Sequence, residues 1–307
     1  MLTADGIVLA GENVLWTTLL NHPSYHVLDI MGQLQPTLAS MPLRHAAGRV
    51  AMLSGPGSHI YGHWLVDILP RLFVLASCGY DLSALRFVIS AALPQFCHEF
   101  LHLLGIGEDQ LIRHNERYEL LQVEELLLPS NLRLGSRFHP LMRPAVAFLR
   151  ERISAHSSLD PRWRPNRRLF VSRRGGEPSR TLQNREEIEA IAAAEGYEIV
   201  RPEALAVTEQ IAMFASAAQI VGEYGSGLHN SVFSSPATVV MALRGTSHHP
   251  GFLQSGLGDV FGQPTGYVLS PTAIDAVDQL FQVPANAFRL GLRCVELLVR
   301  RGAGLVA

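Results

Sequence analysis

The sequence contains no lysine, so all 25 of its basic residues are arginines. This absence excludes Schiff-base catalysis by lysine and phosphate binding by a P-loop lysine. An anionic ligand must therefore be held by arginine, histidine or backbone N–H groups. The formal net charge of the 307 residues is only −2, whereas nucleic-acid-binding proteins usually carry a basic surplus. We therefore expect no nucleic acid among the partners.

Cysteines are few, and long apolar runs are missing. The three cysteines, Cys78, Cys97 and Cys294, form neither a CxxC pair nor a zinc-type spacing, which indicates buried thiols in a reducing compartment. No apolar run approaches the roughly 20 residues that cross a bilayer, and the first residues lack the pattern of a signal peptide. We expect a cytoplasmic protein, and we leave open a peripheral contact with the inner face of a membrane and a homodimer.

Motifs for a metal or a serine nucleophile are also missing. There is no D-x-D pair of carboxylates to hold Mg²⁺ on a diphosphate. His248 and His249 are adjacent in a loop and have no partner at the spacing of a helical metal site. Ser54 and Ser226 lie in glycine-rich turns that do not match the G-x-S-x-G pattern. The sequence therefore predicts no metal and no cofactor, and it does not support a hydrolase triad.

Strands and helices alternate along most of the chain, which is typical of α/β proteins with a parallel sheet and crossover helices. In the first half the apolar patterns predict strands at 49–53, 86–90, 110–113 and 123–128, and helices at 62–77, 94–104 and 140–156. In the second half they predict strands at 169–172, 197–200, 219–222 and 238–243, and helices at 184–195 and 207–215, with Asn184 as an N-cap. The polar segment 157–168 is expected to link two domains, 1–157 and 158–307. The last helix is a candidate for packing back on the N-terminal half.

The segment Tyr61–Leu72 carries the first group of candidate site residues. On a helix, His63, Asp67 and Arg71 are one turn apart and share one stripe, separate from the apolar stripe. A histidine and a carboxylate at this spacing are suited to general-base catalysis, since one can orient or tune the other. Pro70 is expected to cost the helix a hydrogen bond and to kink it. The alternative is a structural helix with a salt-bridged polar face.

Two glycine-rich segments in the second half follow predicted strands, at the edge of the sheet where α/β folds bind ligands. In the first, Arg173, Arg174 and Arg180 flank a Gly-Gly turn and are suited to binding phosphate oxygens. In the second, Gly222–Asn230, a G-x-G turn opens a helix whose N–H groups could bind an anion. The missing third glycine of the dinucleotide motif disfavours NAD. A solvated loop and an empty tight turn remain the alternatives.

In order and spacing these segments resemble glycosyltransferase family 61. That family has an H-W-x-x-D-x-L-P-R-L segment, then S-R with a later arginine, and then G-x-x-G-x-G-L-x-N. The corresponding residues here are His63–Leu72, Ser172–Arg173 with Arg180, and Gly222–Asn230. Shorter matches are R-x-x-x-N at Arg180–Asn184, P-E at Pro202–Glu203 and E-Q-I at Glu209–Ile211. The resemblance covers roughly residues 50–245.

The resemblance implies a GT-B-like α/β fold, with two Rossmann-like domains that face each other across a cleft. It also implies metal-independent, inverting transfer of a sugar from a nucleotide-diphosphate donor. We expect a UDP-sugar donor and a glycan or lipid-linked saccharide acceptor, in bacterial surface polysaccharide synthesis. Asp67 would be the base, oriented or tuned by His63, with His229 as a weaker candidate. The residues expected to bind substrate are Arg71, Arg173, Arg174, Arg180, Asn184, Glu203, Gln210, Glu223, Gly225, Ser226, Gly227, Leu228, His229 and Asn230.

One departure from the family pattern is Glu223-Tyr224, where relatives more often have a small residue followed by histidine. The change puts an anionic group near the expected diphosphate and leaves the donor preference open. Two alternatives to a sugar transferase therefore stay open. One is a GT-B-like module that binds a nucleotide sugar or glycan without turnover, and the other is a transferase that moves a different group to a glycan.

Overall fold

The computed structural model describes residues 2, 7–10, 13–15, 39–157, 165–173, 181–246, 252–270 and 280–304. The chain forms two compact units. Unit 1 comprises Met1–Leu134 and Ala147–His156, and unit 2 comprises Gly135–Val146 and Ser157–Ala307. The sequence analysis assigned Gly135–Val146 to the N-terminal domain, whereas its contacts group it with unit 2.

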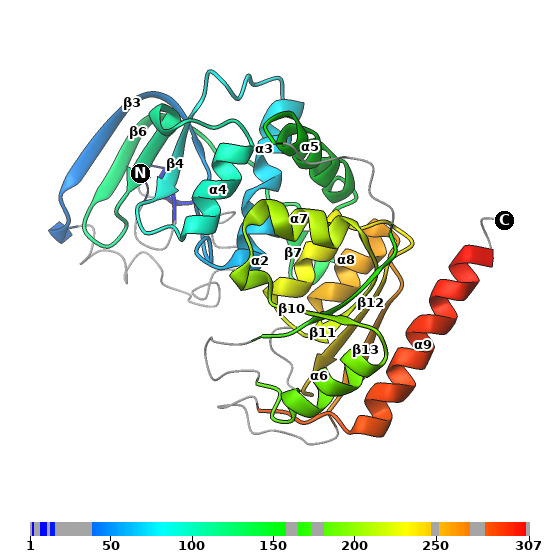
Figure 1. The fold of residues 1–307 in the computed structure, drawn as a ribbon. Helices are drawn as coiled ribbons and strands as arrows, with labels where there is room; N and C mark the ends of the chain where they lie inside the picture. Colours follow the sequence, from blue (N-terminus) through cyan, green and yellow to red (C-terminus); the bar gives the residue numbers. More distant parts are fainter. Residues whose placement is uncertain are drawn as a thin grey trace. The chain divides into compact units, whose positions relative to one another are not determined.

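Unit 1 is built on a four-stranded sheet in the order β5-β4-β3-β6, with all pairs parallel (Figure 1). The strands are β3 (Leu43–Met52), β4 (Arg86–Ser90), β5 (Leu111–His114) and β6 (Leu120–Leu127). The chain begins in the middle of this sheet, moves outward through β4 and β5, and then returns to the other side of β3. The strand order therefore reverses between β3 and β6, which is the place where open α/β sheets bind ligands, beyond the carboxyl ends of the strands.

The helices of unit 1 follow the predicted alternation. They are α2 (Tyr61–His63), the π-helix η4 (Trp64–Ile68), α3 (Pro70–Ser77), α4 (Gln95–Leu103), the short 3₁₀ turn η5 (Glu108–Gln110) and the part of α5 (Met142–Ala155) from Ala147 onward. Trp64, Phe87 and Phe100 are fully buried, and Phe73 and Phe148 meet edge to face at 5.9 Å, which ties α3 to α5. Two-stranded pieces complete the described part, β1 (Leu9–Ala10) with β2 (Asn13–Val14) in unit 1, and β7 (Arg133–Leu134) with β8 (Arg137–Phe138).

Pro70 interrupts the helical hydrogen bonds, as its missing N–H predicts. It stands at the first position of α3, and the turn before it is a π-helix, in which the Leu69 N–H donates to the Trp64 carbonyl at 2.9 Å. A single π turn inside a helix often occurs at a functional site. Here the π turn contains Asp67.

Unit 2 is built on a five-stranded parallel sheet in the order β10-β9-β11-β12-β13 (Figure 1). The strands are β9 (Arg167–Val171), β10 (Glu198–Val200), β11 (Ala217–Glu223), β12 (Val239–Arg244) and β13 (Thr265–Leu269). The chain starts at β9, adds β10 on one side and then crosses back to add the others on the opposite side. The order reverses between β9 and β11, so this unit too has an edge of the kind at which open α/β sheets bind ligands.

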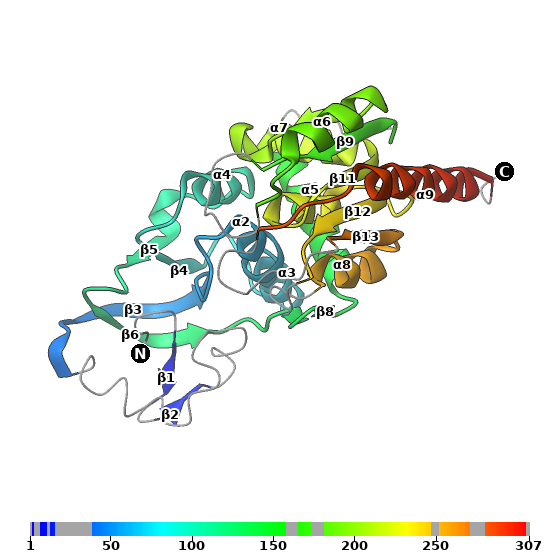
Figure 2. The same ribbon diagram turned by 90° about the horizontal axis from the view of Figure 1, so that it is seen from below.

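Helices cover both faces of this sheet (Figures 1 and 2). Along β9, Phe170 contributes to one core cluster, while Leu169 and Val171 contribute to the other, as the period of two in a strand requires. The first cluster includes residues of α6 (Arg185–Ala194) and α9 (Ala285–Gly304). The second includes residues of α7 (Val207–Ala215), the 3₁₀ helix η7 (Ser226–Phe233) and α8 (Leu253–Phe261). The short turn η6 (Pro202–Ala204) follows β10.

The predicted fold class, α/β with two Rossmann-like parts, is confirmed; the cleft between them stays a prediction. The sequence analysis did not foresee α8 or β13. Helix α9 packs against β12, β13 and α6 of unit 2, and its suggested packing on the N-terminal half stays a prediction. Of the three cysteines only Cys97 is buried, while Cys78 and Cys294 are exposed. The prediction of three buried thiols is therefore wrong for two of them.

Candidate active site

Arg71 joins the two loops that follow β3 and β6 at the carboxyl edge of the unit 1 sheet. Its Nη1 donates to the Ser54 carbonyl at 2.7 Å, and its Nη2 donates to Asn131 Oδ1 at 2.9 Å. Ser54 follows β3 and Asn131 follows β6, so the bonds bridge the strands between which the sheet order reverses. Burial lowers the pKa of Arg71 to about 10, so it stays charged at neutral pH. Arg71 is only 6% exposed, and its hydrogen bonds connect the two loops; its predicted contact with substrate stays a prediction.

Asp67 is held by an arginine that the sequence analysis missed. Arg133 Nε donates to Asp67 Oδ1 at 2.7 Å, and Arg133 Nη2 donates to Oδ2 at 2.6 Å. The carboxylate is 5% exposed. Its burial raises the pKa of Asp67, but hydrogen bonds with His63 and Arg133 and the charge of Arg133 bring the pKa below its ordinary value. Asp67 is therefore ionised at neutral pH, with both oxygens engaged.

The imidazole of His63 is oriented by the same carboxylate. His63 Nδ1 lies 2.7 Å from Asp67 Oδ2, and an ionised carboxylate only accepts hydrogen bonds, so Nδ1 carries the proton. This leaves Nε2 as the acceptor of the ring, on a side chain that is 36% exposed. The loop after β3 packs on the imidazole, since a Cβ on Gly57 would lie 2.9 Å from the ring. Gly57 also has φ +74°, so both the close ring and the left-handed backbone favour glycine at this position.

In unit 2, Arg173 lies across the glycine turn that follows β11. Its Nη1 donates to the Tyr224 carbonyl at 3.3 Å, and a Cβ on Gly225 would lie 3.0 Å from the same nitrogen. Gly222 permits the strands to pair this closely, because a Cβ there would lie 2.2 Å from the Val171 carbonyl oxygen. Both glycines are thus explained by close approach, and they bring a guanidinium to the edge where β9 and β11 end.

Glu223 is the centre of a small ionic network at this edge. Arg185 Nε and Nη2 donate to its two carboxylate oxygens at 2.6 and 2.9 Å, and the Arg173 N–H donates to Oε1 at 3.1 Å. Glu223 is 1% exposed, and its hydrogen bond raises the pKa of Arg185. The negative charge that the sequence analysis placed near the diphosphate is therefore neutralised by an arginine that it did not identify.

Tyr224, which stands where relatives more often have histidine, is part of the core. It is 5% exposed, and its hydroxyl accepts a hydrogen bond from the Leu253 N–H at 2.8 Å, at the start of α8. The guanidinium of Arg244 lies 4.9 Å from the centre of its ring. Tyr224 therefore supports the end of the sheet and the start of α8.

Several other residues predicted to bind substrate form hydrogen bonds within unit 2, and their role in binding stays a prediction. The Asn184 amide donates to the Val283 carbonyl and accepts from the Val283 N–H, at 2.8 and 3.2 Å. Asn184 precedes α6 as predicted, but its side chain makes no capping hydrogen bond. Buried Asn230 donates to Gln210 Oε1 at 3.1 Å, which joins η7 to α7.

The remaining predicted residues are distributed around the same edge. Leu228 and His229 are buried, and Ser226 and Gly227 are half-buried in the turn. Glu203 is exposed after β10, where its charge contributes to raising the pKa of Arg185. Arg174 and Arg180 lie outside the described residues.

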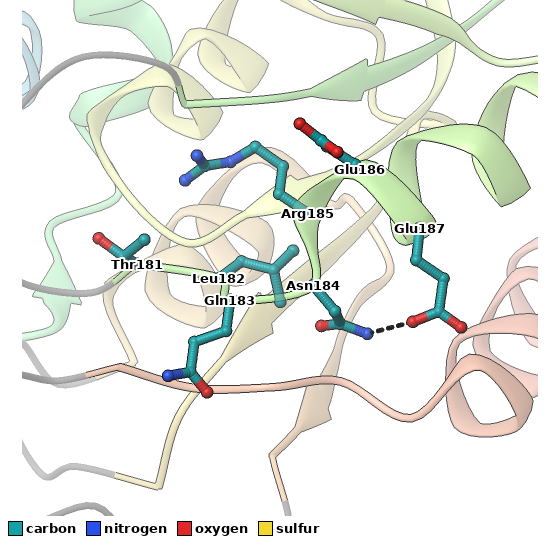
Figure 3. Close-up of a pocket in the computed structure, with 7 residues that line it drawn as sticks. All are labelled: Thr181, Leu182, Gln183, Asn184, Arg185, Glu186 and Glu187. Carbon is teal, nitrogen blue, oxygen red and sulfur yellow. Dashed lines mark hydrogen bonds between the residues drawn. The ribbon is translucent and has the colours of Figure 1, made fainter.

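A cavity of about 360 Å³ lies beside the start of α6, lined by residues Thr181 to Glu187. Figure 3 shows Asn184 and Glu187 joined by a hydrogen bond, 2.8 Å long, while Arg185 points away from that pair. Arg185 therefore both lines the cavity and pairs with Glu223.

Within the described ranges, no three His, Cys, Asp or Glu side chains gather as a metal site would require. His248 and His249 lie outside those ranges. Among the described helices none is long and apolar enough to cross a membrane.

A model of the family described as Glycosyltransferase 61 matches residues 61–241, more than half of the chain. The chain belongs to glycosyltransferase family 61. The matched span begins at the His63–Asp67 segment and extends through the Gly222–Asn230 turn into β12. The enzyme is thus a glycosyltransferase, as the resemblance implied.

Two solved structures are similar to this glycosyltransferase. One is the iron-containing dodecameric glycosyltransferase TibC of enterotoxigenic E. coli H10407, with 13% identity and a TM-score of 0.38 over 87% of this chain and 77% of that one. The other is TibC, described as a heptosyltransferase, in complex with ADP-D-beta-D-heptose, with 14% identity and a TM-score of 0.39 over the same shares. A search of curated proteins finds no match.

Proposed function

We propose that this glycosyltransferase moves a sugar from a nucleotide-diphosphate donor, in the first instance a UDP-sugar, to a hydroxyl group of a glycan or glycolipid, with inversion and without a metal. We further propose a role in bacterial surface polysaccharide synthesis. The observation that carries the proposal is the guanidinium of Arg173 over the Gly225 turn, at the edge where β9 and β11 end. Cationic side chains and backbone N–H groups at such an edge stabilise a departing diphosphate.

The geometry changes the roles proposed for the catalytic pair. A general base works best when its pKa is near the working pH, whereas the pKa of Asp67 is lowered and both of its oxygens accept hydrogen bonds. His63 has its Nε2 left as an acceptor. We therefore propose that His63 Nε2 takes the proton of the acceptor hydroxyl, and that Asp67 orients the ring and stabilises the imidazolium that forms.

The pairing of Glu223 with Arg185 weighs against the alternative of an inactive binding module. That alternative assumed an uncompensated carboxylate beside the diphosphate. The carboxylate instead holds Arg185 and the Arg173 backbone in place. Transfer assays over UDP-, GDP-, ADP-, CMP- and dTDP-sugars test the proposal, and the anomeric configuration of the product, read by NMR, tests inversion. Donor binding without turnover on any acceptor would favour the inactive module.

Arg173→Ala is expected to weaken binding of the donor nucleotide about 10- to 100-fold, because a charge-assisted hydrogen bond to phosphate is worth roughly 1.5–3 kcal/mol. Calorimetric titration with the nucleoside diphosphate measures the effect. The matched control is Arg167→Ala, since Arg167 begins β9 at the opposite edge of the sheet and pairs with Glu198. Equal affinities of Arg173→Ala and the unaltered enzyme would place the diphosphate elsewhere.

Transfer activity is expected to persist in excess EDTA, since Arg173 and the N–H groups of the glycine turn stabilise the leaving group in this proposal. Initial rates with and without the chelator, on enzyme first dialysed against it, provide the measurement. Loss of turnover that Mn²⁺ or Mg²⁺ restores would contradict both the metal-free mechanism and the arginine clamp.

A further inference from the structure

Helix α9 has two apolar faces, of which its own unit covers one. Phe288, Leu292 and Val295 are at most 5% exposed and belong to the core cluster on one face of the unit 2 sheet. The approach is close, since a Cβ on Gly291 would lie 2.7 Å from the Met241 sulfur. In Figure 1 this helix, in red, runs along that sheet. These residues recur every three or four positions, which is the pattern of a helix buried on one side.

The opposite face of α9 is apolar and exposed. Leu290, Leu297 and Leu298 are 62%, 57% and 40% exposed, and Cys294 between them is exposed too. Leu290 and Cys294 are four positions apart, Cys294 and Leu297 three, and Leu290 and Leu298 eight, so all four lie on one side of the helix. An amphipathic helix that only covers a sheet would carry polar residues here. The leucines of this face therefore need a second explanation.

Positive charge accompanies these leucines. The thirteen residues from Arg289 to Arg301 include four arginines and a single acid, Glu296. Arg289 and Arg300 form ion pairs, with Glu195 at 3.3 Å and with Glu296 at 3.0 Å. Arg293 and Arg301 form no ion pair within the described part of the chain. Two cations are thus available to a ligand next to the exposed leucines.

We propose that this face of α9, made of Leu290, Arg293, Cys294, Leu297, Leu298 and Arg301, binds the surface of a membrane that contains anionic lipids. Leucine side chains enter the boundary between headgroups and acyl chains, while arginines contact lipid phosphates. With 20 residues, the helix is about 30 Å long and would lie in the plane of the membrane.

Charge argues against a second copy of the chain as the occupant. A two-fold symmetric contact through this face would set Arg293 and Arg301 of one copy beside those of the other. Like charges at a contact disfavour it, whereas an anionic lipid surface complements them. The inference does not depend on the proposed donor chemistry. It would bring the enzyme to the surface where a lipid-linked acceptor resides.

Flotation of the full chain with phosphatidylcholine vesicles, prepared with and without phosphatidylglycerol, tests the proposal. The enzyme is expected to float with the anionic vesicles and to be released by salt. The double variant Arg293→Gln/Arg301→Gln is expected to lower the partition coefficient roughly thirtyfold, about fivefold for each arginine. Leu290→Ser/Leu297→Ser is expected to lower it by at least about tenfold through lost apolar burial.

The matched control is Tyr118→Ser/Leu134→Ser, which removes two apolar side chains that are 69% and 62% exposed in unit 1 and should leave flotation unchanged. Equal flotation of the α9 variants and the unaltered chain overturns the proposal, as does no preference for anionic vesicles. So does a dimer, seen by light scattering, that the α9 leucine variant converts to a monomer. The nucleotide affinity and Tm of each variant show whether it is folded. They also distinguish a failure of membrane binding from a failure of the proposed transfer chemistry.

Discussion

His63→Gln is expected to lower kcat by about 10²- to 10⁴-fold, the usual effect of removing a general base. Glutamine keeps a polar side chain of similar reach but cannot take a proton at neutral pH. Donor affinity and Tm should stay close to their original values, because the side chain is 36% exposed and donates a single hydrogen bond, to Asp67. Turnover, calorimetric titration and thermal melting of one preparation measure all three quantities.

His59→Gln is the matched control, since His59 is exposed and lies one turn of chain before His63. It should leave turnover unchanged. An active His63→Gln enzyme would contradict the assignment of the base, and Asp67 and His229 would be tested next. The Asp67→Asn variant is a weaker test of the base, because the amide also leaves the buried guanidinium of Arg133 without its counter-charge. A loss of activity could then follow from a loss of stability.

Arg133→Met is expected to lower the free energy of unfolding by about 3–5 kcal/mol, because it leaves the charge of Asp67 buried without its partner. Both side chains of this pair are 6% exposed. Turnover of the folded fraction should fall too, since Asp67 no longer has two fixed oxygens to orient His63. Urea unfolding and turnover at saturating substrate measure the two effects. The control is Arg49→Met, which breaks the exposed Arg49–Glu125 pair and should cost less than about 1 kcal/mol.

The same pair sets the direction of a pH effect. The folded state holds the pKa of Asp67 below its unfolded value, so the unfolded state binds the proton more readily. The resulting stability is complete above the unfolded pKa, near pH 4, and is lost as the pH falls further toward the folded pKa. The Arg133→Met variant should not show this loss of stability on acidification. Parallel acid-unfolding curves of the two proteins would show that Asp67 and Arg133 do not stabilise the fold as a pair.

The sequence by itself determined the class of the fold and the family. The helix Val207–Ala215 and the strand Arg86–Ser90 have the predicted bounds, because apolar periodicity and turn residues are local signals. The segments around His63, Arg173 and Gly225 carried the family pattern, and each follows a strand or opens a helix as expected. Local spacing was also sufficient for the His63–Asp67 contact, since residues one turn apart share a face.

Only the tertiary structure decided which distant side chains pair with the candidate site residues. Arg133 meets Asp67 from 66 positions away, and Arg185 meets Glu223 from 38 positions away; neither arginine stands in a pattern that a sequence reveals. Arg71 and Asn184 are in the family motif, yet their hydrogen bonds are made with distant loops. The reason is physical. Periodicity specifies which face a residue takes, whereas its partners depend on strand order and crossover connections, which bring together segments far apart in the chain.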